Sequence, residues 1–320
     1  MVDFNKRRAG KGSEKKTDPL EIYDSLDRKS ETGPLRPAQA QILSDWYSQR
    51  RDDKDLIIKL HTGQGKTLIG LLILQSRLNE GRGPALYLCP NIYLVHQTFE
   101  QANKFGIRCC LVESDGQIPY DFLNGNKILI THIQKVFNGL TKFKLGSQSI
   151  QVDTVILDDS HACIDSIKDA LSLKIPNASP VYNQFLALFE SDLKNQGEGS
   201  FLEILNGERT TLPVPYWSWN EKQSDVLNIL SHNKEEDSIK FTWPLIKDNL
   251  ENCQAFISGQ EIEITQYIGT IWQFGTFHNA KQRILMSATT LDDSFFIKGL
   301  SIDAQAVEKP LMYQKEKWSG

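Results

Sequence analysis

The sequence reads Leu60-His61-Thr62-Gly63-Gln64-Gly65-Lys66-Thr67 where an apolar, strand-like run over residues 56–60 passes into an apolar, helix-compatible run over residues 68–78. A strand, a loop ending in Gly-Lys-Thr and a helix form the layout of a phosphate-binding P-loop. Glycines at 63 and 65 let backbone N–H groups close around an anion, and the start of the helix adds its own unpaired donors. Lys66 then reaches the terminal phosphates, and the Thr67 hydroxyl ligates Mg²⁺.

The stretch departs from the strict P-loop pattern at one position, because Leu60 stands where the pattern has a glycine. The alternative interpretation is a glycine turn ahead of a core helix, with Lys66 as a solvated side chain. Motifs further along the chain favour the phosphate-binding interpretation.

The composition is that of a globular, water-soluble chain. Its 320 residues suffice for one large domain or two ordinary ones, and 40% of them are hydrophobic and 24% charged. The net charge of −4 gives no overall basic field, so a nucleic-acid partner would need a local basic groove.

The five cysteines are odd in number and include no C-x-x-C pair, which favours a reducing compartment. The longest apolar run, residues 68–74, is too short to span a bilayer, and we find no signal peptide. We therefore expect a cytoplasmic protein with no membrane association.

Short apolar strands alternate with helical segments after the P-loop. This alternation predicts an α/β fold, in which a parallel sheet has helices on both faces and binds ligands at the carboxyl ends of its strands. The expected strands are residues 85–89, 107–112, 127–131, 152–157 and 283–286, and the expected helices include residues 94–104 and 133–139.

Between residues 164 and 274 the pattern changes to apolar patches at helical spacing, with Pro-rich turns and four of the six tryptophans. We predict a mostly helical inserted subdomain there, within a lobe built from residues 31–163 and 275–320. The aromatic run Tyr216-Trp217-Ser218-Trp219 could stack on single-stranded bases. Such residues more often fill a core, which is the interpretation that we favour.

Residues 1–30 are predicted to be a basic, flexible arm. Between Lys6 and Lys16, six Lys or Arg residues and one acid give a local charge of +5. Runs of this kind are usually solvated tails. Contact with a phosphate backbone is the alternative.

A second chemical feature, Asp158-Asp159, follows the apolar strand expected at residues 152–157. In that position Asp158 would hold Mg²⁺, and Asp159 would orient or deprotonate the attacking water. The alternative is that the two acids cap a helix that begins near His161. A P-loop about ninety residues upstream, on a strand that we expect to be a neighbour, favours the catalytic interpretation.

Six short motifs, taken in order, resemble those of superfamily 2 DEAD/DEAH-box helicases. The motifs are Arg36-x-x-Gln39, His61 to Thr67, Cys89-Pro90-Asn91-x-x-Leu94-Val95-x-Gln97, Ile130-Thr131-His132, Asp158-Asp159-Ser160-His161 and Ser287-Ala288-Thr289. The resemblance covers residues 35–161 and about 275–300. It implies a RecA-like lobe that binds ATP and Mg²⁺ and acts on nucleic acid, with DNA favoured over RNA.

The resemblance also implies a role for each matched position. Catalysis would fall to Lys66, Asp158, Asp159 and His161, with Thr67 and Asp158 as the Mg²⁺ ligands. ATP contacts would come from Arg36, Gln39, Thr62, Gly63, Gln64, Gly65, Lys66 and Thr67, with Gln39 reading the adenine edge. Ser287 and Thr289, with His161, would couple the nucleotide site to the strand-binding face. Nucleic-acid contacts would come from Pro90, Asn91, Gln97 and Thr131. Taken singly, Gln39 also fits a surface amide, His161 a helix start and Ser287 a strand end.

The insertion lies between the Asp-Asp-Ser-His and Ser-Ala-Thr motifs, which is similar to the place of the arch domain in XPD/DinG-like helicases. Those helicases often hold an iron–sulfur cluster on four cysteines between the first and second ATP motifs. Here that interval contains only Cys89, Cys109 and Cys110, so we expect no cluster.

Two features bear on activity. Asp159 stands where the family usually has Glu, and a misplacement of about one C–C bond costs on the order of 100-fold in rate. Only 31 residues follow Thr289. We therefore expect the second RecA-like lobe, with its arginine finger, to come from a longer chain or a partner protein. The rival expectation is a nucleotide-binding module that docks a protein, with little hydrolysis or unwinding.

Overall fold

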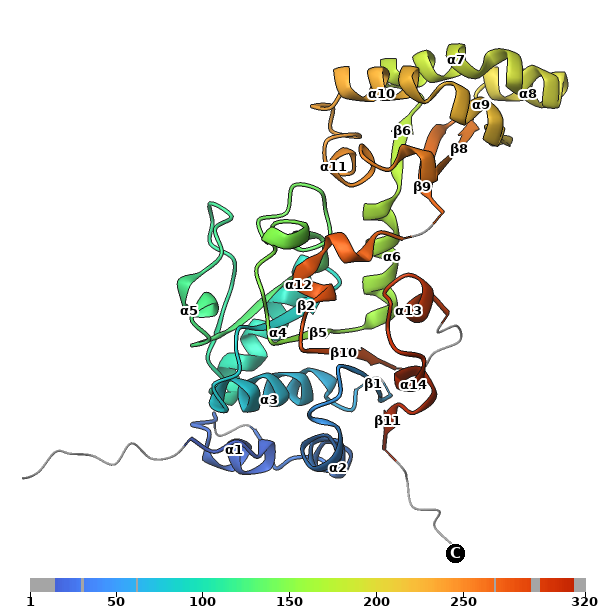
Figure 1. Ribbon diagram of the computed structural model, residues 1–320. Helices are drawn as coiled ribbons and strands as arrows, with labels where there is room; N and C mark the ends of the chain where they lie inside the picture. Colours follow the sequence, from blue (N-terminus) through green and yellow to red (C-terminus); the bar gives the residue numbers. More distant parts are fainter. Residues whose placement is uncertain (1–14, 30–31, 62, 268, 289–293, 314–320) are drawn as a thin grey trace, which may run out of the picture.

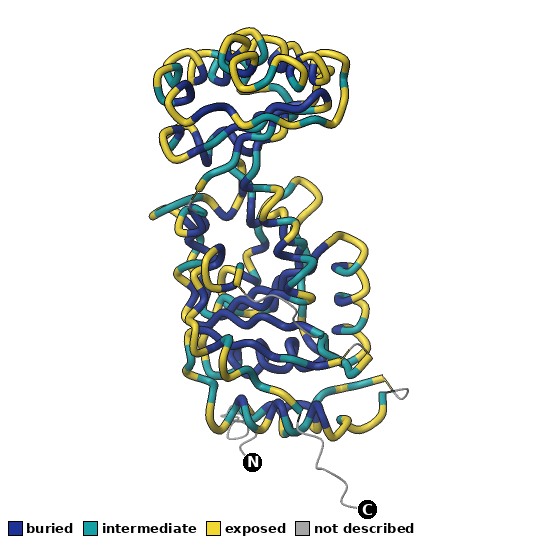
Figure 2. Tube along the Cα trace, turned by 90° about the vertical axis from the view of Figure 1, so that its right-hand side faces the viewer, coloured by how far each residue is buried: buried dark blue, intermediate teal, exposed yellow. Residues whose placement is uncertain are grey.

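The computed structural model describes residues 15–29, 32–61, 63–267, 269–288 and 294–313. A large parallel sheet has helices on both of its faces, and a smaller antiparallel sheet stands above it with helices of its own (Figure 1). The central strands of the large sheet are buried, whereas buried residues alternate with half-buried or exposed ones along most of the small sheet. The exposed residues lie mainly on the outer helices and loops (Figure 2). Among the residues described, no helix has the length and apolar character needed to cross a membrane.

The large sheet contains seven parallel strands in the order β11-β1-β10-β5-β2-β4-β3. Strand β10 lies between β1 and β5, so the expectation that the P-loop strand and the Asp158 strand are direct neighbours was wrong. The bounds are β1 Asp55–Lys59, β2 Ala85–Cys89, β3 Cys109–Cys110, β4 Ile128–His132, β5 Thr154–Leu157, β10 Gln282–Ser287 and β11 Leu311–Met312.

Alternate residues of each strand face two different hydrophobic cores, because the side-chain period of a strand is two. Leu56 and Ile58 pack with the helices of one face, whereas Ile57 packs with those of the other. The first face carries α1 Pro19–Ser25, α2 Pro37–Asp45, α3 Lys66–Asn79 and α4 Ile92–Phe105. The second carries α5 Tyr120–Leu123, α6 Ser160–Leu171, α12 Gly275–His278, α13 Ser294–Lys298 and α14 Ala304–Glu308. The prediction of a parallel α/β fold with helices on both faces is confirmed.

The remaining elements around the large sheet are short. A π-helical turn extends α2, and the helix expected at residues 133–139 is a single 3₁₀ turn. The bounds are η2 Trp46–Arg50, η3 Ile133–Lys135, η4 Gly146–Gln148, η5 Leu250–Asn252 and η6 Ile271–Gln273.

Helix α1 occupies part of the stretch for which we expected a flexible arm. Its start is capped by Asp18, whose side chain accepts a hydrogen bond from the Leu20 N–H at 2.8 Å, and Pro19 fits the first helical position. Ile22 and Tyr23 are each 2% exposed and belong to the core that α3 also faces. Residues 1–14 of the expected arm lie outside the described residues.

The inserted stretch contains a four-stranded antiparallel sheet that the sequence analysis did not predict. Its strands, in the order β6-β9-β8-β7, are β6 Leu173–Pro176, β7 Thr211–Pro213, β8 Cys253–Ser258 and β9 Glu261–Gln266. The accompanying helices are α7 Pro180–Gln196, α8 Glu198–Leu205, α9 Tyr216–Glu221, α10 Gln223–His232 and α11 Trp243–Ile246. We call residues 172–267 the small subdomain.

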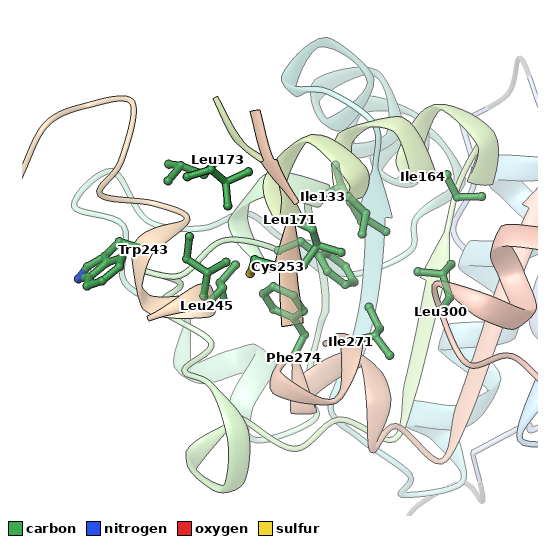
Figure 3. Close-up of a cluster of buried hydrophobic side chains, with 14 of the residues drawn as sticks. Ile133, Ile164, Leu171, Leu173, Trp243, Leu245, Cys253, Ile271, Phe274 and Leu300 are labelled. Atoms are coloured by element: carbon green, nitrogen blue, oxygen red, sulfur yellow. The ribbon is translucent and has the colours of Figure 1, made fainter. Parts of the chain in front are cut away.

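One hydrophobic core runs from the large sheet into the small subdomain. Ile133, Leu171, Leu173, Leu245 and Phe274 belong to it and come from both parts of the chain (Figure 3). Helix α6 leads directly into β6 and carries this core upward from the large sheet (Figure 1). The continuous core indicates that the small subdomain is fixed to the large sheet and not joined to it by a loose linker.

Candidate nucleotide-binding site

The P-loop lies between the carboxyl end of β1 and the start of α3. Gly63 and Gly65 have φ angles of +83° and +79°, in the left-handed region that favours glycine. A Cβ atom at Gly65 would come within 2.2 Å of the Gln39 Nε2 atom, so a side chain there would displace Gln39. Thr62 lies outside the described residues. The two glycines therefore leave bare backbone in this loop, and its role as a phosphate cradle stays a prediction.

Two side chains at the start of α2 hold this loop. The Arg36 guanidinium donates to the Gly63 carbonyl, and the Gln39 Nε2 donates to the Gly65 carbonyl at 3.2 Å. The other end of the Gln39 amide accepts from the Arg36 N–H at 2.9 Å, and the residue is 5% exposed. Each end of the amide therefore makes one hydrogen bond to the protein, and the bond to Gly65 helps to position the P-loop. Each end also keeps one donor or acceptor, and Gln39 lines the cavity described below, so its contact with the adenine edge stays a prediction.

The acidic pair follows β5 at the same edge of the sheet. Asp158 is half-buried and Asp159 is exposed. The Asp159 N–H donates to the Asp158 Oδ1 at 3.0 Å, and Asp159 has a φ of +45° where α6 begins. Asp tolerates this left-handed conformation better than most residues with a side chain. The turn therefore holds the two carboxyl groups in different environments.

The environment of Asp158 suits a cation. Burial raises the pKa of the Asp158 carboxyl, and the Asp159 charge raises it further, whereas the Tyr87 hydroxyl and the Lys66 charge lower it. The Tyr87 hydroxyl is near enough to have this effect but has no hydrogen-bond partner in the part of the chain that the structure describes. A half-buried carboxylate gains more from a bound metal ion than an exposed one, because water does not already stabilise its charge.

Several buried polar atoms at this edge have no hydrogen-bond partner among the described residues. They include the hydroxyl oxygens of Tyr87, Ser160 and Ser287 and the Nε2 atom of His161. Register pairs Leu157 with Leu285, so the segments that follow β5 and β10 run side by side and bring Ser160 and Ser287 to the same edge. Buried polar groups without partners are rare in folded proteins, and a cluster of them fits a site that a polar ligand completes.

One cavity of about 730 Å³ joins the P-loop and the acidic pair. The P-loop and the acidic pair lie on one side of it, and α4 lies on the other. Its lining includes Arg36, Gln39, Gly63, Gly65, Lys66, Thr67, Leu94, Gln97, Gln101, Lys104, Asp158, Asp159 and Ala288. Gln64, in the turn closed by its N–H to the His61 carbonyl at 3.3 Å, is not part of that lining. The predicted ATP residues therefore mostly come together, and the cavity also includes α4 residues that sequence reasoning did not assign to ATP.

Sequence reasoning missed two contributions to this site. Gln97 was predicted to contact nucleic acid, and it lines this cavity with Gln101 and Lys104, which share its face of α4. Tyr87 was visible only as a residue of an apolar strand, and its place beside Asp158 depends on the pairing of β2 with β5. The α4 contribution left a signal in the sequence, because Gln97, Gln101 and Lys104 are spaced at i, i+4 and i+7, which places them on one face of a helix.

The other predicted nucleic-acid residues lie at the carboxyl ends of β2 and β4, which pair directly. Pro90 is buried and Thr131 is 3% exposed, so neither side chain offers surface to a partner. Asn91 is exposed and caps α4 by accepting from the Leu94 N–H at 3.0 Å. Next to it Ile92 and Tyr93 are 56% and 74% exposed, a pair that the sequence analysis did not single out.

Two of the predicted coupling residues follow neighbouring strands: His161 lies in the first turn of α6, which follows β5, and Ser287 is the last residue of β10. The His161 ring centroid is 5.5 Å from that of Phe296 in α13, a contact that connects α6 with the segment after β10. Thr289 lies outside the described residues.

A Gly65→Ala variant is expected to weaken ATP binding by roughly ten-fold or more, because the new methyl group displaces Gln39 and strains a left-handed residue by about 1–2 kcal/mol. Gly81→Ala is the matched control. Gly81 has a φ of +76° at the other end of α3 and has open space around it. It should lose similar stability without losing affinity. Calorimetric titration with Mg·ATP measures the affinity of each variant. Equal affinity in the two variants would contradict the role of Gln39.

Comparison with known proteins gives three results. The family described as type III restriction enzyme, res subunit, matches residues 32–195. The ATP-dependent DNA helicase Hel308 of Pyrococcus horikoshii is 27% identical over 138 residues, which are 42% of this chain and 18% of Hel308. A solved XPD helicase structure aligns over 88% of this chain and 62% of that chain, with a TM-score of 0.51 and 13% identity. The last result concerns the fold alone, and the chain spans less than two thirds of either protein.

Proposed function

Because the chain belongs to the family described as type III restriction enzyme, res subunit, we propose that it is the ATP-binding lobe of a helicase or translocase. Family and fold together identify a RecA-like lobe of the superfamily 2 helicase type. In our proposal this lobe couples Mg·ATP hydrolysis to movement along nucleic acid, and the similarity to a DNA helicase favours DNA. Residues 31–163 and 275–320 would form the lobe, and residues 164–274 the insertion.

The observation that carries this proposal is the shared cavity. The P-loop after β1 and the acidic pair after β5 line one space of about 730 Å³, although β10 separates their strands. If the glycines only formed a turn before a core helix, we would not expect the start of α3 to share a cavity with an acidic pair. The unpaired polar atoms at the same edge add to this support.

ATP fits the cavity by the chemistry of its lining. The N–H groups at the start of α3 and the Lys66 ammonium would hold the β- and γ-phosphates. Thr67 and Asp158 would hold Mg²⁺, which neutralises charge on the phosphates when bound. Asp159, which is exposed at the cavity, would orient the attacking water. Gln39, together with Gln97 and Gln101 of α4, would supply amides to contact the base or ribose.

Two further parts are needed for a motor. A second RecA-like lobe, from a longer chain or from a partner protein, would close over the cavity and supply an arginine. The nucleic acid would lie along the carboxyl ends of β2 and β4, where Asn91, Ile92 and Tyr93 are exposed and Pro90 and Thr131 could contribute only backbone groups. His161 and Ser287 would connect that edge to the nucleotide. The five free thiols are compatible with a cytoplasmic location, which we include in the proposal.

The test is ATP hydrolysis by the protein at its native length, with and without single-stranded DNA. The proposal predicts stimulation of at least about ten-fold, because DNA that closes two lobes also brings in an arginine worth roughly 10³- to 10⁵-fold. Asp159→Asn should bind Mg·ATP normally and show no stimulated hydrolysis.

A nucleotide-binding module that docks a protein is the second candidate, and the exposed aromatic residues of the small subdomain favour it. ATP binding without DNA-stimulated hydrolysis would contradict the motor and support the module. The two candidates therefore predict opposite results in one assay.

A further inference from the structure

The small subdomain carries an aromatic pocket on its surface. A cavity of about 340 Å³ is lined by Pro213, Pro215, Tyr216, Trp217, Gln254 and Tyr267, among others. Tyr216, Trp217 and Tyr267 are 64%, 65% and 57% exposed, which is unusual for three large aromatic side chains around one hollow.

The pocket is held by buried contacts on the other side of the same segment. Trp219, two residues after Trp217, is 1% exposed, and its indole N–H donates to the Leu250 carbonyl at 2.9 Å. The core interpretation is therefore correct for Trp219 and wrong for Trp217. The Ser218 hydroxyl bonds to an Asp192 carboxylate oxygen at 2.7 Å, and the Val214 N–H to the Ala255 carbonyl at 2.8 Å. The exposed rings thus stand on a fixed backbone, which lowers the entropy cost of binding.

The charge of the small subdomain differs from that of the rest of the chain. Residues 172–267 contain 14 Asp or Glu and 7 Lys or Arg, whereas all other residues contain 26 and 29. Four of those seven cations form ion pairs with carboxylates: Lys174, Lys194, Lys222 and Lys240. The subdomain therefore presents a negative field, which repels phosphate backbones and attracts cations.

We propose that this pocket binds an extended segment of a partner protein that is rich in proline and in Lys or Arg. Grooves lined by aromatic residues accept the preformed helix of proline-rich segments, and the faces of Trp and Tyr attract cations. The Gln254 amide in the pocket lining can donate to a backbone carbonyl of such a segment. Single-stranded nucleic acid could also stack on these rings, but it would bring a chain of phosphates against the negative field.

The proposal is independent of the nucleotide site. The probe is a short fluorescein-labelled peptide that alternates proline and arginine, titrated with the whole protein and followed by fluorescence anisotropy. We expect saturable binding that weakens by roughly ten-fold or more in Trp217→Ala, as for an aromatic anchor in an interface. Trp272→Ala is the matched control, since Trp272 is 59% exposed and does not line the pocket. Both variants should bind Mg·ATP as the unmodified protein does.

Three outcomes would overturn the proposal. The first is an absence of peptide binding, and the second is equal loss in the Trp217 and Trp272 variants. The third is binding of labelled oligothymidylate that Trp217→Ala abolishes, which would assign the pocket to nucleic acid. A peptide with glutamate in place of arginine should fail to bind, and its binding would contradict the role of charge.

Discussion

Lys66→Ala is expected to lower the affinity for Mg·ATP by roughly two orders of magnitude, because charge-assisted hydrogen bonds to phosphate are each worth about 1.5–3 kcal/mol. Lys66 is the first residue of α3, lines the cavity and is close enough to lower the pKa of Asp158. Its side chain is only half-buried and belongs to neither hydrophobic core. The thermal midpoint should therefore stay within a few degrees of that of the unmodified protein.

Calorimetric titration measures the affinity, and circular dichroism on the same samples checks the fold. Lys234→Ala is a suitable control, because Lys234 is an exposed lysine in the small subdomain, away from the cavity lining. Undiminished affinity in Lys66→Ala, with the control also unchanged, would contradict the assignment of the P-loop.

Asp55→Ala is expected to destabilise the fold by about 3–5 kcal/mol, the usual cost of leaving one partner of a buried ion pair uncompensated. The Arg283 Nε and Nη2 atoms donate to the two Asp55 carboxylate oxygens at 2.6 and 2.7 Å, and the residues are 1% and 8% exposed. Arg283 also donates to the carbonyls of Leu300 at 3.1 Å and Ser301 at 2.7 Å. The Asp303 N–H donates to Asp55 at 2.9 Å. This pair thus joins β1, β10 and the segment that enters α14.

Urea unfolding at neutral pH measures the loss. Glu190→Ala breaks the exposed Lys194–Glu190 pair within α7 and should cost less than about 1 kcal/mol. The double variant Asp55→Ala, Arg283→Met removes both charges and should recover part of the stability lost by Asp55→Ala alone. If Asp55→Ala and Glu190→Ala were equally stable, the pair would not be the link that we describe.

The parts of the fold that the sequence predicted correctly depend on local patterns. The apolar strands next to helical segments predicted the parallel α/β arrangement, and Gly63-Gln64-Gly65 marked the turn between β1 and α3. Asp18-Pro19 before an apolar pair was a sufficient signal for helix α1, and we gave more weight to the basic run before it.

The small antiparallel sheet also left a signal in the sequence. Glu261-Ile262-Glu263-Ile264-Thr265 alternates polar and apolar residues, and Gly259-Gln260 before it is a two-residue connection between β8 and β9. The tryptophans and the helical patches nearby dominated our interpretation of this stretch. Here the local pattern was present, and our prediction of a mostly helical subdomain did not include the sheet.

Other features could not be predicted from sequence, because they depend on contacts between distant residues. The position of β10 between β1 and β5 results from pairing between strands that lie far apart in the sequence. The two hydrogen bonds that occupy the Gln39 amide depend on how α2 meets the P-loop. The buried Arg283–Asp55 pair joins two strands through residues that lie outside the six motifs. Such contacts become visible only when the packed structure is known.

Amide hydrogen exchange of the unmodified protein, with and without Mg·ATP, tests the site most directly. We predict slower exchange on ATP addition in three segments that line the cavity: residues 32–39, 63–70 and 94–105. The small subdomain should exchange at the same rate with and without the nucleotide. Unchanged exchange in all three segments, or protection confined to residues 172–267, would contradict the proposal that this cavity binds ATP.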